Sequence, residues 1–152
     1  MAAGMQSAET AASKTAAVTD CAMRHYTVDE ADALIPTLSP VLEDLHDLYL
    51  RLQEAREVVE EFQHLASQNG NARPTRILDP DIDLSKLQSE MHKRMEFLTG
   101  LDVVLKDIEI GLVDFPTRLY DHDVYLCWHL GEERVGFWHE IEEGYRGRRP
   151  LP

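Results

Sequence analysis

The residues best suited to chemistry lie close together in the C-terminal third of the sequence. Cys127 and His129 are two positions apart in a predicted strand, so alternation places both side chains on one face. His139 follows in the next predicted strand, with Asp114 or Glu140 as a further neighbour. Thiolate, imidazole and carboxylate groups are ligands of transition metals such as zinc. One hypothesis is therefore a transition-metal site at Cys127, His129 and His139; no other cofactor is predicted.

The register of the intervening hairpin decides whether these ligands meet. A two-residue loop at 132–133 sets His139 opposite Leu126, on the other face from the two remaining ligands. A three-residue loop at 131–133 sets His139 opposite Tyr125, and all three potential ligands then share a face. The first register builds one continuous apolar face from Leu126, Trp128, Leu130, Val135 and Phe137. Burial of such a face specifies register strongly. We therefore expect the first register, which argues against the metal and favours ordinary strand residues with satisfied side chains.

A second hypothesis treats His139 with Asp114 and Glu140 as an acid–base pair, because a nearby carboxylate can tune a histidine toward neutral pH. No serine or cysteine nucleophile accompanies them in a recognisable motif. We therefore expect Asp114 to cap a turn and His139 to hydrogen-bond the loop that follows. The sequence leaves open whether the protein is an enzyme.

The C-terminal arginines suggest a third site. Arg146 and Arg148 stand in a short basic stretch of an otherwise acidic chain. Guanidinium groups bind carboxylates and phosphates through paired hydrogen bonds, so these arginines, with Asp114 and Glu132, could hold a small anion. The alternative, which we expect, is that Arg148 clamps an internal carboxylate such as Asp114 or Glu132. The C-terminal segment would then be tied to the sheet.

Two helices are expected to begin the domain that positions these residues. The segment from Thr27 to Glu30 has the form of a capping box, which predicts a helix over 28–35 that ends before Pro36. A second helix over 40–67 begins with Ser39 as its N-cap. Its apolar residues recur alternately every three and four positions, as in a coiled-coil seam that requires a partner helix. The seam comprises Leu38, Val41, Leu45, Leu48, Leu52, Ala55, Val59, Phe62 and Ala66.

The partner helix is predicted over 82–99, with Gly100 as its stop signal. Four short strands in a meander should follow, at about 101–107, 111–116, 123–130 and 134–139. An alternative continues the helix through Gly100, but the β-branched residues beyond it favour a strand. The predicted fold is α+β, with a long antiparallel helical hairpin packed on a small antiparallel β-meander. It forms a single domain over 25–152, preceded by a disordered leader at 1–24.

Charge and composition restrict the partners. The net charge of −13 repels phosphate backbones, so no nucleic acid is expected. No apolar segment approaches the length that spans a membrane. The two cysteines do not make a disulfide framework and indicate a reducing compartment, by default the cytoplasm. The helix at 40–67 is longer than the helix at 82–99, so part of its apolar seam has to be buried against another surface. A homodimer or a protein partner through these helices is therefore predicted.

A series of short motifs extends along most of the chain. They are Tyr26-Thr-Val-Asp-Glu-Ala31, Ala33-Leu-Ile-Pro36, Gly111-Leu-Val-Asp-Phe-Pro116, Val124-Tyr-Leu-Cys-Trp128, Leu130-Gly-Glu132, Trp138-His139 and Gly144-Tyr-Arg-Gly-Arg148. In this order they resemble an uncharacterised bacterial family catalogued as domain of unknown function 2203. The resemblance covers nearly everything from Tyr26 to Leu151, and it implies a relative in fold without implying a reaction, ligand or partner.

Two functions from different classes follow from the residues. The first, which we expect, is a non-catalytic interaction module that uses its helical hairpin for self-association or partner docking. The second is a small-anion or metal-binding protein, conceivably an enzyme, whose site lies at the end of the sheet and in the C-terminal arginine loop.

Overall fold

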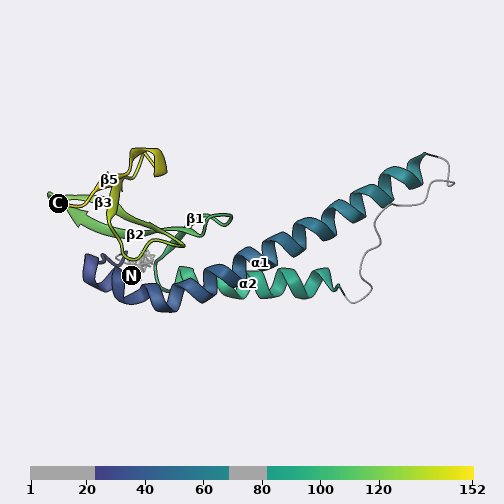
Figure 1. The fold of residues 1–152 in the computed structure, drawn as a ribbon, viewed down its shortest axis with the longest axis horizontal. Coiled ribbons are helices and arrows are strands. Elements are labelled where there is room, and N and C mark those ends of the chain that lie inside the picture. Colours follow the sequence, from purple (N-terminus) through teal and green to yellow (C-terminus); the bar gives the residue numbers. More distant parts are fainter. Residues whose placement is uncertain (1–22, 69–81) are drawn as a thin grey trace, which may run out of the picture.

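The computed structural model describes residues 23–68 and 82–152, which contain two helices and a five-stranded antiparallel sheet. Helix α1 (Val28–Ser67) extends along the molecule, and α2 (Leu84–Gly100) packs antiparallel beside its middle part (Figure 1). The sheet lies over the N-terminal half of α1. The predicted α+β class, a long helical hairpin with a small meander, is thus confirmed. Nearly all of the predicted leader lies outside the described residues.

Helix α1 begins as the sequence indicates. The backbone N–H of Glu30 donates to Thr27 Oγ1 at 3.2 Å, and the N–H of Thr27 donates to the Glu30 carboxylate at 2.9 Å, which completes the capping box. The expected division into helices at 28–35 and 40–67 is wrong, because one helix continues through both segments.

Two internal prolines, Pro36 and Pro40, lie within this continuous helix. Each lacks the N–H that an internal position needs, at a cost of about 3 kcal/mol or more. Both prolines are exposed, so the disrupted turns face solvent. On the other side of the same turns, Ala31, Leu38 and Leu42 are buried in the core against the sheet. This burial keeps the segment helical where local propensity predicts a break.

Most of the apolar seam of α1 is buried. The buried residues are Ala31, Leu38, Leu42, Leu45, Leu48, Leu52, Ala55 and Val58. From Leu38 to Ala55 the seam follows the predicted residues, except that Leu42 is buried in place of the half-buried Val41. It then continues at Val58 instead of Val59, and the predicted member Phe62 is 45% exposed. On the facing helix, Arg94 of α2 forms an ion pair with Asp44 at 3.0 Å.

Helix α2 ends at Gly100, as expected, and does not continue into the sheet. Its N-cap is Asp83, whose carboxylate accepts from the N–H of Lys86 at 3.2 Å. A turn that includes Asp102 at φ 57° separates the helix from β1 (Val104–Asp107), so this strand is shorter than the predicted 101–107. Within the described residues, neither helix combines the length and the apolar character that crossing a bilayer requires.

The strands follow one another in the sheet in chain order, from β1 to β5. After β1 come β2 (Leu112–Leu119), β3 (His122–His129), β4 (Phe137–Glu140) and β5 (Arg149–Pro150). The expected strands at 111–116, 123–130 and 134–139 are thus present with shifted ends. The two-residue strand β5 was not predicted, because a proline-containing pair carries no alternation pattern.

The expected register of the β3–β4 hairpin is wrong. His139 pairs with Tyr125, and Trp138 pairs with Leu126. The preferred register assumed a two-residue loop, but the connection runs from residue 130 to 136. The hairpin still has a continuous apolar face, because Trp138 takes the place expected for Phe137 and lies with Leu126 in the core. A pair of adjacent aromatic residues allowed either register, and the longer loop selected the other one.

Candidate metal centre

Three neighbouring strands each supply one ligand-type side chain to the face of the sheet that is turned away from the helices. Asp114 of β2 pairs directly with Cys127 of β3, and His139 of β4 pairs with Tyr125, two positions from Cys127. Because Val113, on the other face of β2, belongs to the core that α1 covers, alternation directs Asp114 to the outer face. The corrected register thus joins His139 to Cys127.

The ligand-type atoms of Asp114, Cys127 and His139 converge closely. They all lie within 4.8 Å of one another, and His139 Nε2 is 3.0 Å from Asp114 Oδ2. Ligand atoms around a tetrahedral zinc ion are about 3.3–3.6 Å apart, given bond lengths of about 2.0–2.3 Å. Movements of about an ångström would therefore bring the three atoms onto one ion.

The ring of His139 is held in the orientation that a metal ligand needs. Its Nδ1 is 2.8 Å from the carbonyl oxygen of Glu140, and a carbonyl only accepts, so Nδ1 carries a hydrogen. In the neutral ring the lone pair is then on Nε2, which faces Asp114. A backbone carbonyl that fixes the tautomer in this way is a regular partner of metal-bound histidine. A proton or another cation must lie between Nε2 and Oδ2, since two lone pairs would repel.

Burial makes the anionic forms of this cluster costly. Asp114 and Cys127 are fully buried, and His139 is 1% exposed. Burial raises the pKa of Asp114, although His139 and Lys106 act in the opposite direction. Burial, together with the charge of Asp114, raises the pKa of the Cys127 thiol to about 12. The other carboxylate oxygen, Asp114 Oδ1, is buried without a hydrogen-bond partner. A cation bound between these side chains would compensate the negative charge of the Asp114 carboxylate and of the Cys127 thiolate.

Two cation–π pairs lie next to the cluster. Lys106 Nζ lies 5.1 Å from the centroid of the Tyr125 ring and 3.8 Å from Asp114 Oδ2. The guanidinium of Arg148 lies 4.2 Å from the centroid of Phe137, the residue paired with Cys127. The ammonium of Lys106 and the guanidinium of Arg148 therefore place positive charge near a site that can hold two negatively charged ligands.

The expected arginine clamp has a clear partner. Arg148 Nη2 is 2.8 Å from both carboxylate oxygens of Glu132 and also donates to the carbonyl of Cys127 at 3.3 Å. Arg148 does not pair with Asp114, and its charge is matched by Glu132. Arg146 lies exposed in a short 3₁₀ turn, Tyr145–Gly147.

His129 shares the face of Cys127 but does not join the cluster. Its Nε2 is 3.5 Å from the Glu132 carboxylate, and its Nδ1 is 2.8 Å from the carbonyl of Leu130. The predicted trio of Cys127, His129 and His139 is therefore replaced by one in which Asp114 takes the place of His129. Asp114 lies next to Cys127 because β2 pairs directly with β3, and the spacing of residues within one strand does not report that pairing.

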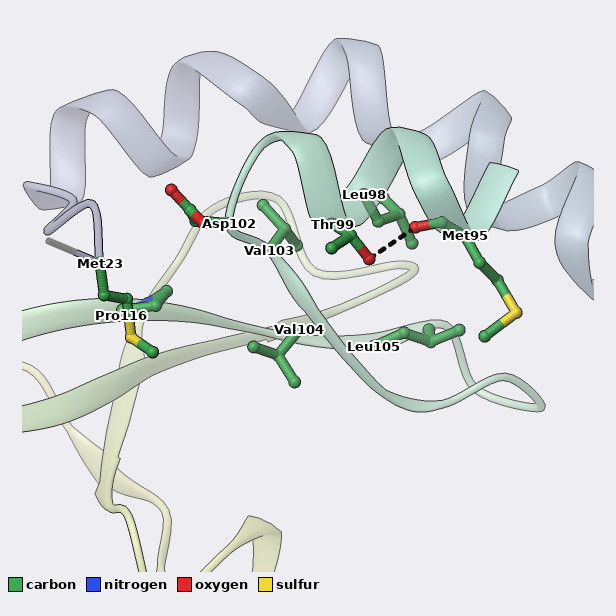
Figure 2. A pocket seen from close by; sticks show the side chains of 9 residues that line it. All are labelled: Met23, Met95, Leu98, Thr99, Asp102, Val103, Val104, Leu105 and Pro116. Carbon is green, nitrogen blue, oxygen red and sulfur yellow. Dashed lines mark hydrogen bonds between the residues drawn. The ribbon is translucent and has the colours of Figure 1, made fainter. Parts of the chain in front are cut away.

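An apolar hollow of about 310 Å³ lies between the end of α2 and β1 (Figure 2). Met23, Met95 and Leu105 contribute to its lining. Its polar side chains are Thr99 and Asp102, and Thr99 Oγ1 donates to the carbonyl of Met95 at 3.0 Å, as the figure shows. None of the ligand-type residues of the metal centre lines this hollow.

Comparison with known proteins gives one match. A family model described as "Uncharacterized conserved protein (DUF2203)" matches residues 24–151. No curated protein matches the chain, and no solved structure does.

Proposed function

The chain belongs to the DUF2203 family of uncharacterized conserved proteins, a membership that assigns no reaction, and we propose that it binds a divalent transition-metal ion. Asp114, Cys127 and His139 are the protein ligands. One observation supports this above the others: three different ligand atoms converge within 4.8 Å at a buried point. The Asp114 carboxylate adds to it, because its Oδ1 is buried with no nitrogen or oxygen donor and the Cys127 thiol interacts with this carboxylate.

The ligand set favours zinc. Thiolate sulfur and imidazole nitrogen suit a borderline-soft ion, and zinc also accepts a carboxylate oxygen. Magnesium and calcium prefer oxygen ligands alone and do not fit a site that contains Cys127. Three protein ligands leave one position of a tetrahedral ion for a ligand from solution.

The same geometry argues against nucleophilic catalysis by Cys127. The thiolate is the reactive form of cysteine, and burial raises the pKa of this thiol to about 12. At neutral pH the group is therefore a thiol unless a cation replaces its proton. Metal binding is the chemistry that burial of this cysteine still permits, since coordination removes the proton.

A reducing, cytoplasmic location is part of this proposal. Cys127 is a free cysteine, and a metal-binding thiol must stay reduced. Two negatively charged ligands also neutralise the two charges of the ion, so the buried site carries no large net charge when it is filled.

Metal content and titration test the proposal. Protein purified without an affinity tag should contain about one equivalent of zinc, or bind it on titration in a calorimeter. The variants Cys127→Ala and His139→Gln should each weaken binding at least about 100-fold, because even residues that only orient ligands contribute about 10–100-fold. His129→Gln is the matched control, and its binding should equal that of the parent. Failure of the parent protein to bind any transition metal would refute the proposal.

Partner docking on the helical hairpin is a second candidate. Phe62, a predicted seam residue of α1, is 45% exposed, and Leu50 is 51% exposed. In a contact between chains these side chains would be removed from water. This candidate concerns a different part of the molecule from the metal centre, so the two functions are compatible.

A further inference from the structure

Lys106 lies beside the metal centre at a β-bulge. In the pairing of β1 with β2, Leu105 faces Val113 and Asp107 faces Leu112, which leaves Lys106 as the extra residue. A bulge bends the strand locally and redirects a side chain. The ammonium group of Lys106 lies 3.8 Å from Asp114 Oδ2, while the side chain remains 40% exposed. One side of this group therefore contacts the proposed metal ligands, and the other contacts solvent.

The ligands of the filled site balance the ion but leave the charge of the neighbouring Lys106 unmatched. A divalent ion with the thiolate of Cys127 and the carboxylate of Asp114 is neutral, so the charge of Lys106 is left over. Arg148 adds nothing to this excess, because Glu132 pairs with it at 2.8 Å. Within the described part of the chain, Asp114 is the carboxylate that Lys106 pairs with. Once a metal takes that carboxylate, the ammonium lacks a counter-charge.

The neighbouring carboxylates are engaged elsewhere. The Asp107 side chain accepts from the N–H of Glu109 at 2.8 Å, within its own turn. Glu140 is 3.2 Å from His122 and 3.6 Å from Arg149. The counter-charge of Lys106 in the filled site would therefore come from solution.

The coordination geometry gives that anion a place. A ligand in the open position of a tetrahedral ion lies about 3.3 Å from each oxygen ligand. Lys106 Nζ is 3.8 Å from the oxygen of Asp114, so an anion bound on the Lys106 side of that oxygen would contact both cations. We infer that the fourth ligand of the metal is a small oxyanion, such as a carboxylate, which binds between the ion and Lys106. This inference rests on the proposed metal site, and it assigns to Lys106 the anion-binding role that the sequence suggested for Arg146 and Arg148.

Cobalt(II) substitution tests the inference, because the visible absorption of cobalt reports its ligands. Acetate is the probe, with chloride at equal ionic strength as the reference and phosphate as a bulkier oxyanion. Acetate should change the spectrum of the cobalt-loaded parent protein and should strengthen cobalt binding about tenfold. The effect must be reciprocal, so cobalt should strengthen acetate binding by the same factor.

Lys106→Met separates the role of the ammonium from that of its apolar stem. This variant should lose the acetate effect. In the absence of acetate it should bind cobalt about tenfold more tightly than the parent, because a positive charge about 5 Å from a divalent ion is removed. Lys93→Met, at an exposed position of α2, is the matched control and should behave like the parent.

The outcomes distinguish the two proposals. If the parent protein binds no cobalt, the metal proposal fails and this inference fails with it. If cobalt binds but acetate leaves the spectrum unchanged, or acts equally on Lys106→Met, the anion site is refuted while the metal proposal stands. An equal response to chloride and to acetate would also refute an oxyanion site.

Discussion

Replacing His139 by Leu should destabilise the metal-free protein by about 3–5 kcal/mol, the range for breaking a buried ion pair by removal of one partner. The structural reason is Asp114. Its side chain is 1% exposed, its Oδ1 already lacks a partner, and its Oδ2 would keep only Lys106 at 3.8 Å. The reverse change, Asp114→Val, should cost less, about 1–3 kcal/mol, because the group left without its partner is one ring nitrogen and not a buried carboxylate.

The double variant, Asp114→Val with His139→Leu, should be much more stable than the sum of the single changes. Replacing both members of a buried pair by apolar residues is often close to neutral, so we expect a loss of about 0–2 kcal/mol. The coupling between the two positions should therefore exceed about 2 kcal/mol, well above the error of about 0.5 kcal/mol for independent sites.

Urea unfolding at pH 7 in the presence of a chelator measures the four free energies of this cycle. His129→Leu is the matched control. It removes a histidine 3.5 Å from Glu132 that is 28% exposed, and such pairs contribute about 0–1 kcal/mol. The reasoning would be refuted if the losses of the two single variants simply added in the double variant.

Three further predictions follow from the same contacts. Cys127 has a folded-state pKa of about 12 against an ordinary value of 9.0, so the unfolded chain releases its thiol proton first. Unfolding free energy should therefore fall as pH rises from about 9 to 12, and the fall should be smaller in Cys127→Ala, as measured by urea unfolding across this range. Arg148→Ala should lower the unfolding free energy by about 2–3 kcal/mol through loss of a partly buried charged hydrogen bond, whereas Arg146→Ala should stay within about 0.5 kcal/mol. If the exposed Phe62 lies in a contact between copies, light scattering should find a dimer that Phe62→Glu dissociates; a monomer at all micromolar concentrations would contradict self-association.

Local signals in the sequence predicted the parts of the fold that depend on local chemistry. The capping box at Thr27 and the stop at Gly100 are present, and so is the seam through Ala55 apart from the exchange of Val41 for Leu42. The predicted helix break at Pro36 was wrong because the contacts that keep this segment helical are not local. Leu38 and Leu42 are buried against a sheet that follows more than 60 residues later in the chain, and no pattern near the proline reports that contact.

The candidate site depended on a choice that the apolar pattern left nearly balanced. Phe137 and Trp138 are adjacent, so either can continue the buried face that Leu126 begins, and the two options place His139 on opposite faces. Pairing of Asp114 with Cys127 across β2 and β3 is likewise a property of the sheet. Lys106 could not be identified from the sequence, since a bulge depends on the partner strand.

The energetics of the outer face support a role in binding for the buried cluster. An apolar set of side chains would cover this face of the sheet at least as well, because buried ion pairs contribute little net stability. If the double variant of Asp114 and His139 matches the parent in stability without metal, the polar groups have no structural advantage there. Metal binding would then add stability that the apolar variant cannot gain, since an ion present at 100 times its dissociation constant stabilises the folded state by about 2.7 kcal/mol. Zinc should therefore raise the melting temperature of the parent but not that of the double variant. A parent that gains no stability from zinc would contradict this explanation of the cluster.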